Sequence, residues 1–411
     1  MTCMPRWWLA VVVALVLAVP LLGQSCEETM VHDGAERVVH FDVDTTGHWW
    51  VLVAPYQNMV TLVVDGDRYG PYNTITAPVF SPDGSTWSSI GVLNGLISVV
   101  TPTPVNLPQA TAINAILYPQ NSPAAWYRCS NGEQEFVTNG SNTYLAVQPL
   151  GQWATDLFGS NVFYVAQRGS GQTLVRNATD GVFADEILLG GVWHDGRPVY
   201  ASRAGEIWTI YIGTQEVRSN LRRVSNLSVN ATATVLGAVV TTPLGMHALM
   251  FSEEYTEAWM GPQVDDIAYF LLNPFQFLCV WEGTLRGVKN LYYNTAPYPA
   301  GRIRGPVVFS HDGNVMGFLG RDDDDFVTID GKRTMLPRRI STGVVPALHP
   351  SGTSVAYSTG SSMAILDIES TEIALARMCD RVSRTVFDWR TNSFRMLGTF
   401  GERLFLIECR P

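Results

Sequence analysis

The chain has 411 residues, of which 46% are hydrophobic and only 16% are charged, and it contains 36 Gly and 23 Pro. This composition excludes a disordered chain and is typical of a turn-rich globular protein, with a length that suits two average domains or one large all-β domain. The formal net charge is -10 and no basic stripe runs along the sequence. We therefore expect no nucleic-acid partner, because phosphate binding needs clustered Lys and Arg.

The first 25 residues have the pattern of a secretory signal peptide. Arg6 precedes an almost unbroken apolar run over residues 7–22, and small residues follow it. Such a segment directs export and is removed after a small residue, here Gly23 or Ser25. The run is shorter than the ~20 apolar residues that span a bilayer, which makes an uncleaved anchor the weaker alternative. We predict a signal peptide over residues 1–25 and an exported mature chain without a membrane span, in the periplasm, at the cell surface or outside the cell.

A lipid anchor at Cys26 is an alternative to free secretion. Bacterial lipidation needs a cysteine at the new N-terminus, and Cys26 directly follows the signal segment. The usual lipidation motif has Leu three residues before that cysteine, and this chain has Gly23 there. The anchor therefore stays open as an alternative.

The cysteines suggest one disulfide. Of the six cysteines, Cys3 lies in the signal segment, which leaves five in the mature chain. An exported protein keeps disulfides because its surroundings are oxidising, and an odd number leaves at least one cysteine outside an internal pair. No two cysteines have the CxxC spacing of a zinc or redox site. Cys379 and Cys409 lie in the same terminal unit, and we predict a disulfide between them.

One sequence pattern recurs along the mature chain. An apolar strand leads into a turn built on Pro, Asp or Ser with Gly, and a strand with an aromatic residue, a polar hairpin and a third strand follow. Copies start at Phe41, Pro78, Pro306 and Val345. The apolar–polar alternation predicts half-buried strands, and the glycines supply the positive φ of tight turns. The signature turn pairs are Asp83-Gly84, Asp312-Gly313 and Ser351-Gly352.

The spacing of these copies predicts a β-propeller. Aromatic markers of the second strand recur every 37 to 39 residues from Trp50 to Tyr200, and a spacing of 39 continues from Phe318 to Met396. Between Tyr200 and Phe318 the register loosens, with weaker copies near residues 249 and 277. A period of about 40 residues with four short strands is typical of propeller blades.

We therefore predict an all-β protein in which residues 26–411 form a single β-propeller of four-stranded antiparallel blades. The 386 residues of this range predict eight blades of about 48 residues each, with seven to nine allowed. Pairing of a strand over residues 37–43 with one over residues 403–409 would close the ring and remove its exposed edges.

The repeat resembles a known family. The turn over residues 80–84, with the sequence FSPDG, and the hairpin ending Val64-Asp65-Gly66 resemble the WD40-like repeat of TolB-type bacterial propellers. Residues 309–313 and 329–331 are a second copy, and residues 349–352 are a degenerate one. The resemblance implies the fold more than the function, since such repeats occur in binding scaffolds and in accessory domains of enzymes. In the best-known member the propeller belongs to a cell-envelope complex and binds a short peptide at its channel. That role is not carried over, because no separate N-terminal α/β domain is evident in this chain.

No catalytic motif stands out in the sequence. The GxSxG nucleophile motif is absent, and the segment over residues 81–87 is one residue short of an Asp box. Glycoside cleavage in a propeller funnel needs two or three converging carboxylates, for which Asp185, Glu186 and Asp265 are candidates. Without a motif, turn or surface positions explain these acids more simply.

The sequence predicts no cofactor, with weak Ca²⁺ binding left open. Residues 42–47 resemble the opening of a calcium loop, but Val53 stands where the bidentate Glu is expected. Four acids over residues 322–325 are typical of a solvated hairpin tip, and loose Ca²⁺ capture there is the alternative.

The leading hypothesis for function is an exported, non-enzymatic propeller that acts as a binding scaffold for a protein or glycan partner. Aromatic residues in turns or hairpin tips, such as Tyr56, Tyr69, Tyr72 and Trp153, could form part of its binding face, although packing between blades explains them more simply. The alternative is a carbohydrate-active hydrolase or lyase with its site in the funnel. Carboxylates about 5–10 Å apart at the channel mouth would favour that enzyme, and a neutral lining would oppose it.

Overall fold

The computed structural model describes residues 26–411 except for 106, 108–109, 133, 147–148, 256, 299–301, 337–339, 341–343 and 370–372. The predicted signal peptide over residues 1–25 lies outside the described residues and stays a prediction. Among the residues that are described, none forms a helix with the length and apolarity needed to cross a bilayer.

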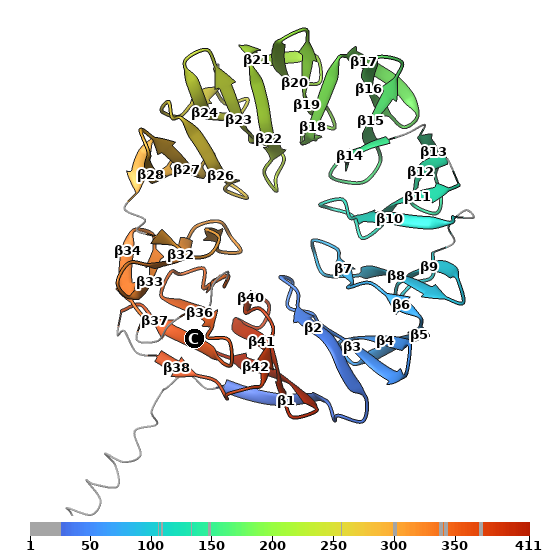
Figure 1. Ribbon diagram of the computed structural model, residues 1–411, viewed down its shortest axis with the longest axis vertical. Coiled ribbons are helices and arrows are strands. Elements are labelled where there is room, and N and C mark those ends of the chain that lie inside the picture. Colours follow the sequence, from blue (N-terminus) through green and yellow to red (C-terminus); the bar gives the residue numbers. More distant parts are fainter. Residues whose placement is uncertain are drawn as a thin grey trace, which may run out of the picture.

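Ten antiparallel sheets stand around a common axis and form one β-propeller (Figure 1). The prediction of an all-β propeller with four-stranded antiparallel blades is confirmed. We number the blades 1 to 10 from residue 37 onward and letter their strands A to D from the axis outward. In blades 2, 8 and 10 the A strand is split into two short pieces that both pair with the B strand.

Blades 1 to 5 contain, in order, β2 (Arg37–Val43), β3 (Trp49–Tyr56), β4 (Met59–Val64) and β5 (Asp67–Tyr72); β6 (Thr74–Ile75), β7 (Val79–Phe80), β8 (Trp87–Leu93) and β9 (Leu96–Val100); β10 (Ala112–Leu117), β11 (Trp126–Asn131), β12 (Gln134–Thr138) and β13 (Thr143–Ala146); β14 (Pro149–Thr155), β15 (Val162–Arg168), β16 (Gly171–Arg176) and β17 (Thr179–Ala184); β18 (Glu186–Val192), β19 (Pro198–Ala204), β20 (Ile207–Ile212) and β21 (Gln215–Leu221).

Blades 6 to 10 contain β22 (Arg223–Val229), β23 (Leu236–Thr242), β24 (Gly245–Phe251) and β25 (Trp259–Met260); β26 (Asp266–Leu272), β27 (Cys279–Leu285), β28 (Val288–Tyr293) and β29 (Ala296–Tyr298); β30 (Arg302–Ile303), β31 (Val308–Phe309), β32 (Met316–Arg321), β33 (Asp325–Ile329) and β34 (Lys332–Met335); β35 (Ala347–Leu348), β36 (Ser354–Ser358), β37 (Met363–Asp367) and β38 (Ile373–Leu375); β39 (Arg381–Val382), β40 (Val386–Asp388), β41 (Ser393–Phe400), β42 (Arg403–Cys409) and β1 (Cys26–His32).

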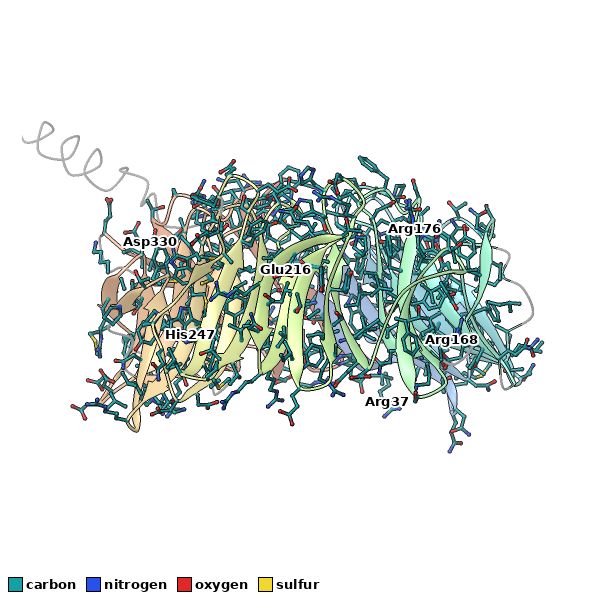
Figure 2. All side chains as sticks on the ribbon, turned by 90° about the horizontal axis from the view of Figure 1, so that it is seen from above. Arg37, Arg168, Arg176, Glu216, His247 and Asp330 are labelled. Carbon is teal, nitrogen blue, oxygen red and sulfur yellow. A yellow bond between two sulfur atoms is a disulfide. The ribbon has the colours of Figure 1, made fainter. Side chains whose placement is uncertain are left out.

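The two faces of the ring carry different connections. The A–B and C–D turns lie on one face, which we call the turn face. The B–C hairpins and the links between blades lie on the other, the hairpin face. In Figure 2, Arg176 and Asp330 at C–D turns lie in the upper half of the ring, and Arg37 and Arg168 at the opposite strand ends lie in the lower half.

A separate hydrophobic cluster fills the gap between each pair of neighbouring blades, and ten such clusters occur in the described residues. Successive side chains of a strand point to opposite faces of its sheet. In β15, Tyr164 therefore packs against blade 3, whereas Phe163 and Val165 pack against blade 5. Each blade thus buries one face on each neighbour.

The predicted number of blades, eight with seven to nine allowed, is wrong, because the ring has ten. Blades 6 and 7 occupy the stretch between Tyr200 and Phe318 where the repeat was weak. The B strand β23 carries no aromatic residue there. Its Ala238 and Val240 are fully buried in the cluster that contains Trp208 of blade 5. The neighbouring blade thus supplies the bulky side chain, and the aromatic residue that marks other B strands is absent from β23.

The first and last of the described strands close the ring. Strand β1 is the D strand of blade 10 and pairs antiparallel with β42, from Cys26 opposite Cys409 to His32 opposite Leu404. The predicted use of residues 403–409 is confirmed, but the expected partner, residues 37–43, is β2, the A strand of blade 1. The closing segment therefore lies further toward the N-terminus than expected.

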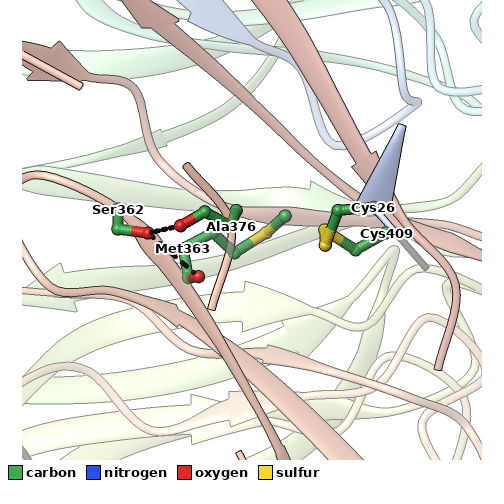
Figure 3. Close-up of a disulfide and its surroundings, with 5 residues drawn as sticks. All are labelled: Cys26, Ser362, Met363, Ala376 and Cys409. Carbon is green, nitrogen blue, oxygen red and sulfur yellow. Dashed lines mark hydrogen bonds between the residues drawn. A yellow bond between two sulfur atoms is a disulfide. The ribbon is translucent and has the colours of Figure 1, made fainter. Parts of the chain in front are cut away.

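A disulfide joins Cys26 and Cys409, whose Cα atoms are 4.0 Å apart (Figure 3). The predicted pair of Cys379 with Cys409 is wrong, since Cys379 is a free, buried cysteine. Cys409 lies in blade 10 and Cys379 in the link that leads into it, but closure of the ring places Cys26 directly opposite Cys409 in the strand register. A sulfur bonded in a disulfide cannot also carry a thioether-linked lipid, so this bond and a lipid anchor at Cys26 exclude each other.

Arginines also cross the seam between blade 10 and blade 1. Arg395 donates to the carbonyl of Gly47 (3.0 Å), and Arg384 donates to the carbonyl of Val43 (2.7 Å). Arg390 reaches further, to the carbonyls of Thr46 in blade 1 and Asp83 in blade 2. Charged donors on backbone carbonyls therefore join the turn faces of the last and first two blades.

Replacing Cys26 with Ser should lower the stability of the oxidised protein. The disulfide joins residues that are 383 apart in sequence, so its loss frees most of the unfolded chain, an effect of about 2–5 kcal/mol. Thermal melts under non-reducing conditions measure the change, with Cys379→Ala, in the link that leads into the same blade, as the matched control. The control should melt closer to wild type than Cys26→Ser. Equal melting of Cys26→Ser and wild type would contradict a stabilising crosslink.

The pair of His48 and Asp65 should make stability depend on pH. His48 Nδ1 lies 2.5 Å from Asp65 Oδ2, and this hydrogen bond raises the pKa of His48 above its ordinary value of 6.5. A raised folded pKa gives stabilisation that is full below about pH 6.5 and is lost as the pH rises through the folded value. The difference in Tm between wild type and His48→Asn should therefore be larger near pH 5.5 than near pH 8.5. A gap that stays constant over this range would count against the pair.

Candidate functional site

The signature residues of the A–B turns hold the turns themselves. In blade 2, the carboxylate of Asp83 accepts hydrogen bonds from the Ser81 hydroxyl (2.6 Å) and the Ser85 N–H (3.0 Å), and Gly84 has a φ of +68°. The Ser81 hydroxyl and the Ser85 backbone lower the pKa of Asp83. The equivalent positions are Asp312 and Gly313 in blade 8 and Ser351 and Gly352 in blade 9, with glycine φ values of +72° and +71°. The side chains of Asp83, Asp312 and Ser351 accept hydrogen bonds within their own turns. The three glycines supply the positive φ that those turns require.

The Val-Asp-Gly and Ile-Asp-Gly endings form C–D turns on the same face. Asp65 and Asp330 have positive φ values of +48° and +43°. Their carboxylates accept the backbone N–H of Trp49 (3.1 Å) and of Met316 (2.9 Å), the first residues of the neighbouring B strands. These acids therefore tie two strands of one blade together.

The acids proposed for the funnel are also structural. Asp185 accepts the N–H of Gly205 (2.7 Å), and Asp265 accepts the N–H of Arg286 (2.6 Å). Both precede an A strand and cap a B–C hairpin on the hairpin face. Glu186 forms an ion pair with Arg203 (3.1 Å). Asp185 and Glu186 hold strands of blade 5, whereas Asp265 serves blade 7, and the structure does not bring the three acids together.

The two calcium candidates are used by internal partners. In the loop over residues 42–47, Asp44 accepts the N–H of Thr46 (2.7 Å), and Asp42 pairs with Arg384 (3.0 Å). In the acidic run, Asp325 is buried, pairs with Arg321 and accepts the N–H of Ile340 (2.6 Å). Within the described residues, no group of three or more His, Cys, Asp or Glu side chains could hold a metal ion.

The free thiols are poorly suited to act as nucleophiles. Burial raises the pKa of Cys129 to about 12 and also raises the pKa values of Cys279 and Cys379. A thiol attacks as the thiolate, and burial in apolar surroundings disfavours that form. The three cysteines are therefore core residues.

Two hollows lie on the axial surface, where A strands pass into A–B turns. The first, the neutral hollow, has a volume of about 280 Å³ and is formed by blades 3 to 6. Its walls are lined by Leu117, Tyr118, Pro119, Gln120, Trp153, Ala154, Thr155, Leu157, Gly191, Val192, Val229, Asn230, Ala231 and Ala233. None of these side chains carries a charge, and Trp153 is half-buried at the wall.

The second hollow, the arginine hollow, lies across the axis at blades 8, 9 and 10, with a volume of about 240 Å³. Arg384 and His311 bring basic groups to its wall, and no carboxylate lines it. The ring of His311 stacks on Trp389 with centroids 5.2 Å apart. The hydroxyl of Thr385 is buried there and has no hydrogen-bond partner among the residues that the structure describes.

Large aromatic side chains are exposed around the turn face. Phe158, Phe275 and Trp389 occupy the A–B turns of blades 4, 7 and 10 with exposed fractions of 65%, 44% and 48%. Tyr255 lies in the C–D connection of blade 6 and packs on Phe277, with ring centroids 4.5 Å apart. Exposed aromatics of this kind are enriched in protein interfaces.

The sequence interpretation singled out Trp153 as a candidate aromatic but missed the rest of its hollow. Tyr56 is 72% exposed on the hairpin face instead, and Tyr69 packs edge-on against Trp87 at 4.7 Å. The repeat period holds the missing signal. Tyr118, Thr155, Val192 and Val229 follow one another at intervals of 37 residues, so equivalent positions of four blades meet at one wall.

Comparisons with known proteins add only distant likenesses. No family model and no curated protein matches the chain. A crystal structure described as the eukaryotic initiation factor is 12% identical, with a TM-score of 0.47, over 77% of this chain and 96% of that one. Oligogalacturonate lyase from Vibrio parahaemolyticus is 9% identical, with a TM-score of 0.32, over 74% and 98%. Hydrazine synthase of Kuenenia stuttgartiensis is 12% identical, with a TM-score of 0.27, over 80% and 94%. Matches at this level say nothing about the activity of this chain.

Replacing Asp265 with Ala should destabilise the protein without removing a catalytic group. The loss of its 2.6 Å bond leaves the N–H of Arg286 without its acceptor, at a cost of about 1 kcal/mol. The neighbouring acid Asp266, which is exposed, offers the matched control, and Asp266→Ala should change stability by less than about 0.5 kcal/mol. Urea denaturation of both variants measures the difference. Equal effects would show that the hairpin does not depend on Asp265.

Proposed function

We propose that this protein is an exported, non-enzymatic propeller of the TolB-like, WD40-like type, and that it binds a protein or glycan partner as a scaffold in the cell envelope or outside the cell. The A–B and C–D turns centred on Asp83 and Asp330 support the family assignment, because they give each signature residue a structural role. The apolar segment over residues 1–25 and the disulfide both suit an oxidising compartment.

The observation that carries this proposal is the set of exposed aromatic side chains on the turn face. Phe158, Phe275 and Trp389 are spaced three blades apart and stand beside the two axial hollows. Each is a single exposed aromatic side chain, a residue type that is enriched in protein interfaces and often contributes most to binding. A rigid ring of turns presents them in fixed positions, which reduces the entropy lost on binding.

The alternative, a carbohydrate-active hydrolase or lyase, has less support. Such an enzyme needs at least two carboxylates within about 10 Å of each other at the substrate. The described walls of both hollows contain no carboxylate. The acids that the sequence suggested for this role, Asp185 and Asp265, cap hairpins on the opposite face.

The test is capture of a partner from an envelope fraction by the immobilised mature chain, residues 26–411. Replacing Phe158, Phe275 and Trp389 together with Ala should weaken capture at least about tenfold, because interface aromatics contribute most to binding. The matched control replaces Tyr56 and Phe400, which are exposed on the hairpin face, and should leave capture unchanged. Equal capture by both variants would contradict a binding face at the turns. Cleavage of envelope glycans by the wild-type chain would favour the enzyme instead.

A further inference from the structure

Blade 2 has no D strand among the residues that the structure describes. Its four strands are the two pieces of the A strand, β6 and β7, the B strand β8 and the C strand β9, and β9 pairs only with β8. The nine other blades each carry a D strand beside the C strand, from β5 in blade 1 to β1 in blade 10. Strand β9 lies at the outer rim of the ring (Figure 1), so its outer edge is open where the other blades have one more strand.

The open edge of β9 leaves main-chain groups without partners. A tight two-residue turn at positions 94–95 joins β8 to β9, so Leu96 forms the first hydrogen-bonded pair with β8. Bonded and non-bonded pairs alternate along such a ladder. The N–H and C=O groups of Ile97 and Val99 therefore point away from β8, and they form no main-chain hydrogen bond to another described residue.

The segment that follows β9 is unsuited to supply the outer strand. It begins with the sequence TPTP over residues 101–104, and a proline has no N–H to donate to a ladder. Further along the segment, Val105, Leu107 and Ala110 pack in the cluster between blades 2 and 3. The described part of this segment therefore buries apolar side chains between the blades and does not pair with β9.

A groove runs beside β9. Its volume is about 600 Å³, which is larger than the volume of either axial hollow. Residues 95–99, which include most of β9, form one wall. The other lining residues are Val105, Leu107, Ala110, Thr111, Ile113 and Asn131. None of these side chains is charged and most are apolar, so the groove offers open main-chain groups beside an apolar surface.

We propose that blade 2 binds an uncharged, extended peptide segment of a partner protein, which pairs antiparallel with β9 in the position of a D strand. Ile97 and Val99 exchange hydrogen bonds with the main chain of this segment, as in other complexes formed by strand addition. Every second side chain of the segment lies on the same face as Ile97, toward the cluster between blades 2 and 3, and is therefore apolar. This site goes beyond the proposed function, because it lies beside β9 and not among the aromatic residues of the turn face.

Blade 10 shows that a D strand of this ring does not have to come from the adjacent segment of the chain. Its D strand β1 pairs with β42, and the disulfide between them joins residues 383 apart in sequence. A C strand of this fold thus accepts a strand from a distant part of the chain. A peptide also repeats the alternating donors and acceptors of β9 at the same spacing, which a sugar does not.

The test measures binding of synthetic peptides to the mature chain by isothermal titration calorimetry. The probe is a capped, uncharged peptide whose central segment is Thr-Val-Thr-Val-Thr, the length of β9, which has five residues. Its two Val residues lie opposite Ile97 and Val99. The peptide should bind with a Kd on the order of 0.1 mM.

Two methylated forms of the probe test the pairing itself. Residues opposite Ile97 and Val99 direct their N–H groups to β9, whereas the residues between them direct theirs to solvent. Methylation of both Val amide nitrogens should therefore weaken binding at least about tenfold. Methylation of the Thr amide nitrogens, the matched control, should change the Kd by less than about threefold.

A variant of the protein identifies the edge. Ile97 is half-buried in the wall of the groove, and Ile97→Lys places a charge there that the bound segment would have to bury. This variant should weaken binding at least about tenfold. The matched control is Val217→Lys, which changes a half-buried residue of β21, the D strand of blade 5, and should bind like wild type. Thermal melts verify that both variants are folded, and the methylated peptides test the pairing on the wild-type chain.

The inference is overturned if the probe does not bind, if the two methylated forms bind equally well, or if Ile97→Lys binds as tightly as wild type. Size-exclusion chromatography tests the other occupant of the edge. A wild-type dimer that Ile97→Lys dissociates would assign the edge to a second copy of the chain and would also overturn the inference. Failure of the proposed function is separate, because Ile97→Lys leaves Phe158, Phe275 and Trp389 of the turn face in place.

Discussion

Hydrophobic contact between neighbouring blades is the interaction on which the rest of the structure depends. Each sheet has apolar side chains on both faces, and each face is covered by a different neighbour, as Phe163 and Tyr164 of β15 illustrate. A blade with only one neighbour would leave half of this surface in water, at roughly 25 cal/mol for each Å² of apolar area. The blades therefore form a closed ring, in which the tenth cluster, between blades 10 and 1, completes the burial.

The ring closes at the seam between blades 10 and 1, because β42 of blade 10 does not lead into blade 1. Three kinds of interaction join it. Strand β1 belongs to blade 10 and continues directly into β2 of blade 1, the disulfide fixes β1 to β42, and arginines of blade 10 donate to carbonyls of blade 1. The turn face inherits this rigidity, since the turns that carry Trp389 and Thr46 are joined through Arg390.

Local sequence pattern was enough to predict the class of fold, but it was not enough to predict which segments lie beside one another in space. Tight turns and strand alternation are encoded within a few residues, so Asp83-Gly84 and Asp312-Gly313 indicated blades correctly. The blade count failed where Trp208 of one blade fills the space beside Ala238 of the next, because the sequence of β23 alone cannot show that exchange. The disulfide failed for a similar reason, since only ring closure brings Cys26 to Cys409. The wall containing Trp153 and Asn230 likewise depends on which blades are neighbours, although the repeat period carried that information in part.

The pairing of β1 with β42 also determines when the ring can close during folding. During synthesis, the strand beginning at Cys26 emerges hundreds of residues before its partner, and the disulfide between them joins residues 383 apart in sequence. Intermediate blades can stack on one another as they emerge, but the outer faces of the growing arc and the edge of the waiting strand remain exposed until residue 409 arrives. Long-range pairing of this kind is slow and leaves partly folded chains prone to associate with one another. The pairing that makes the closed ring rigid therefore also makes its folding depend on the synthesis of β42.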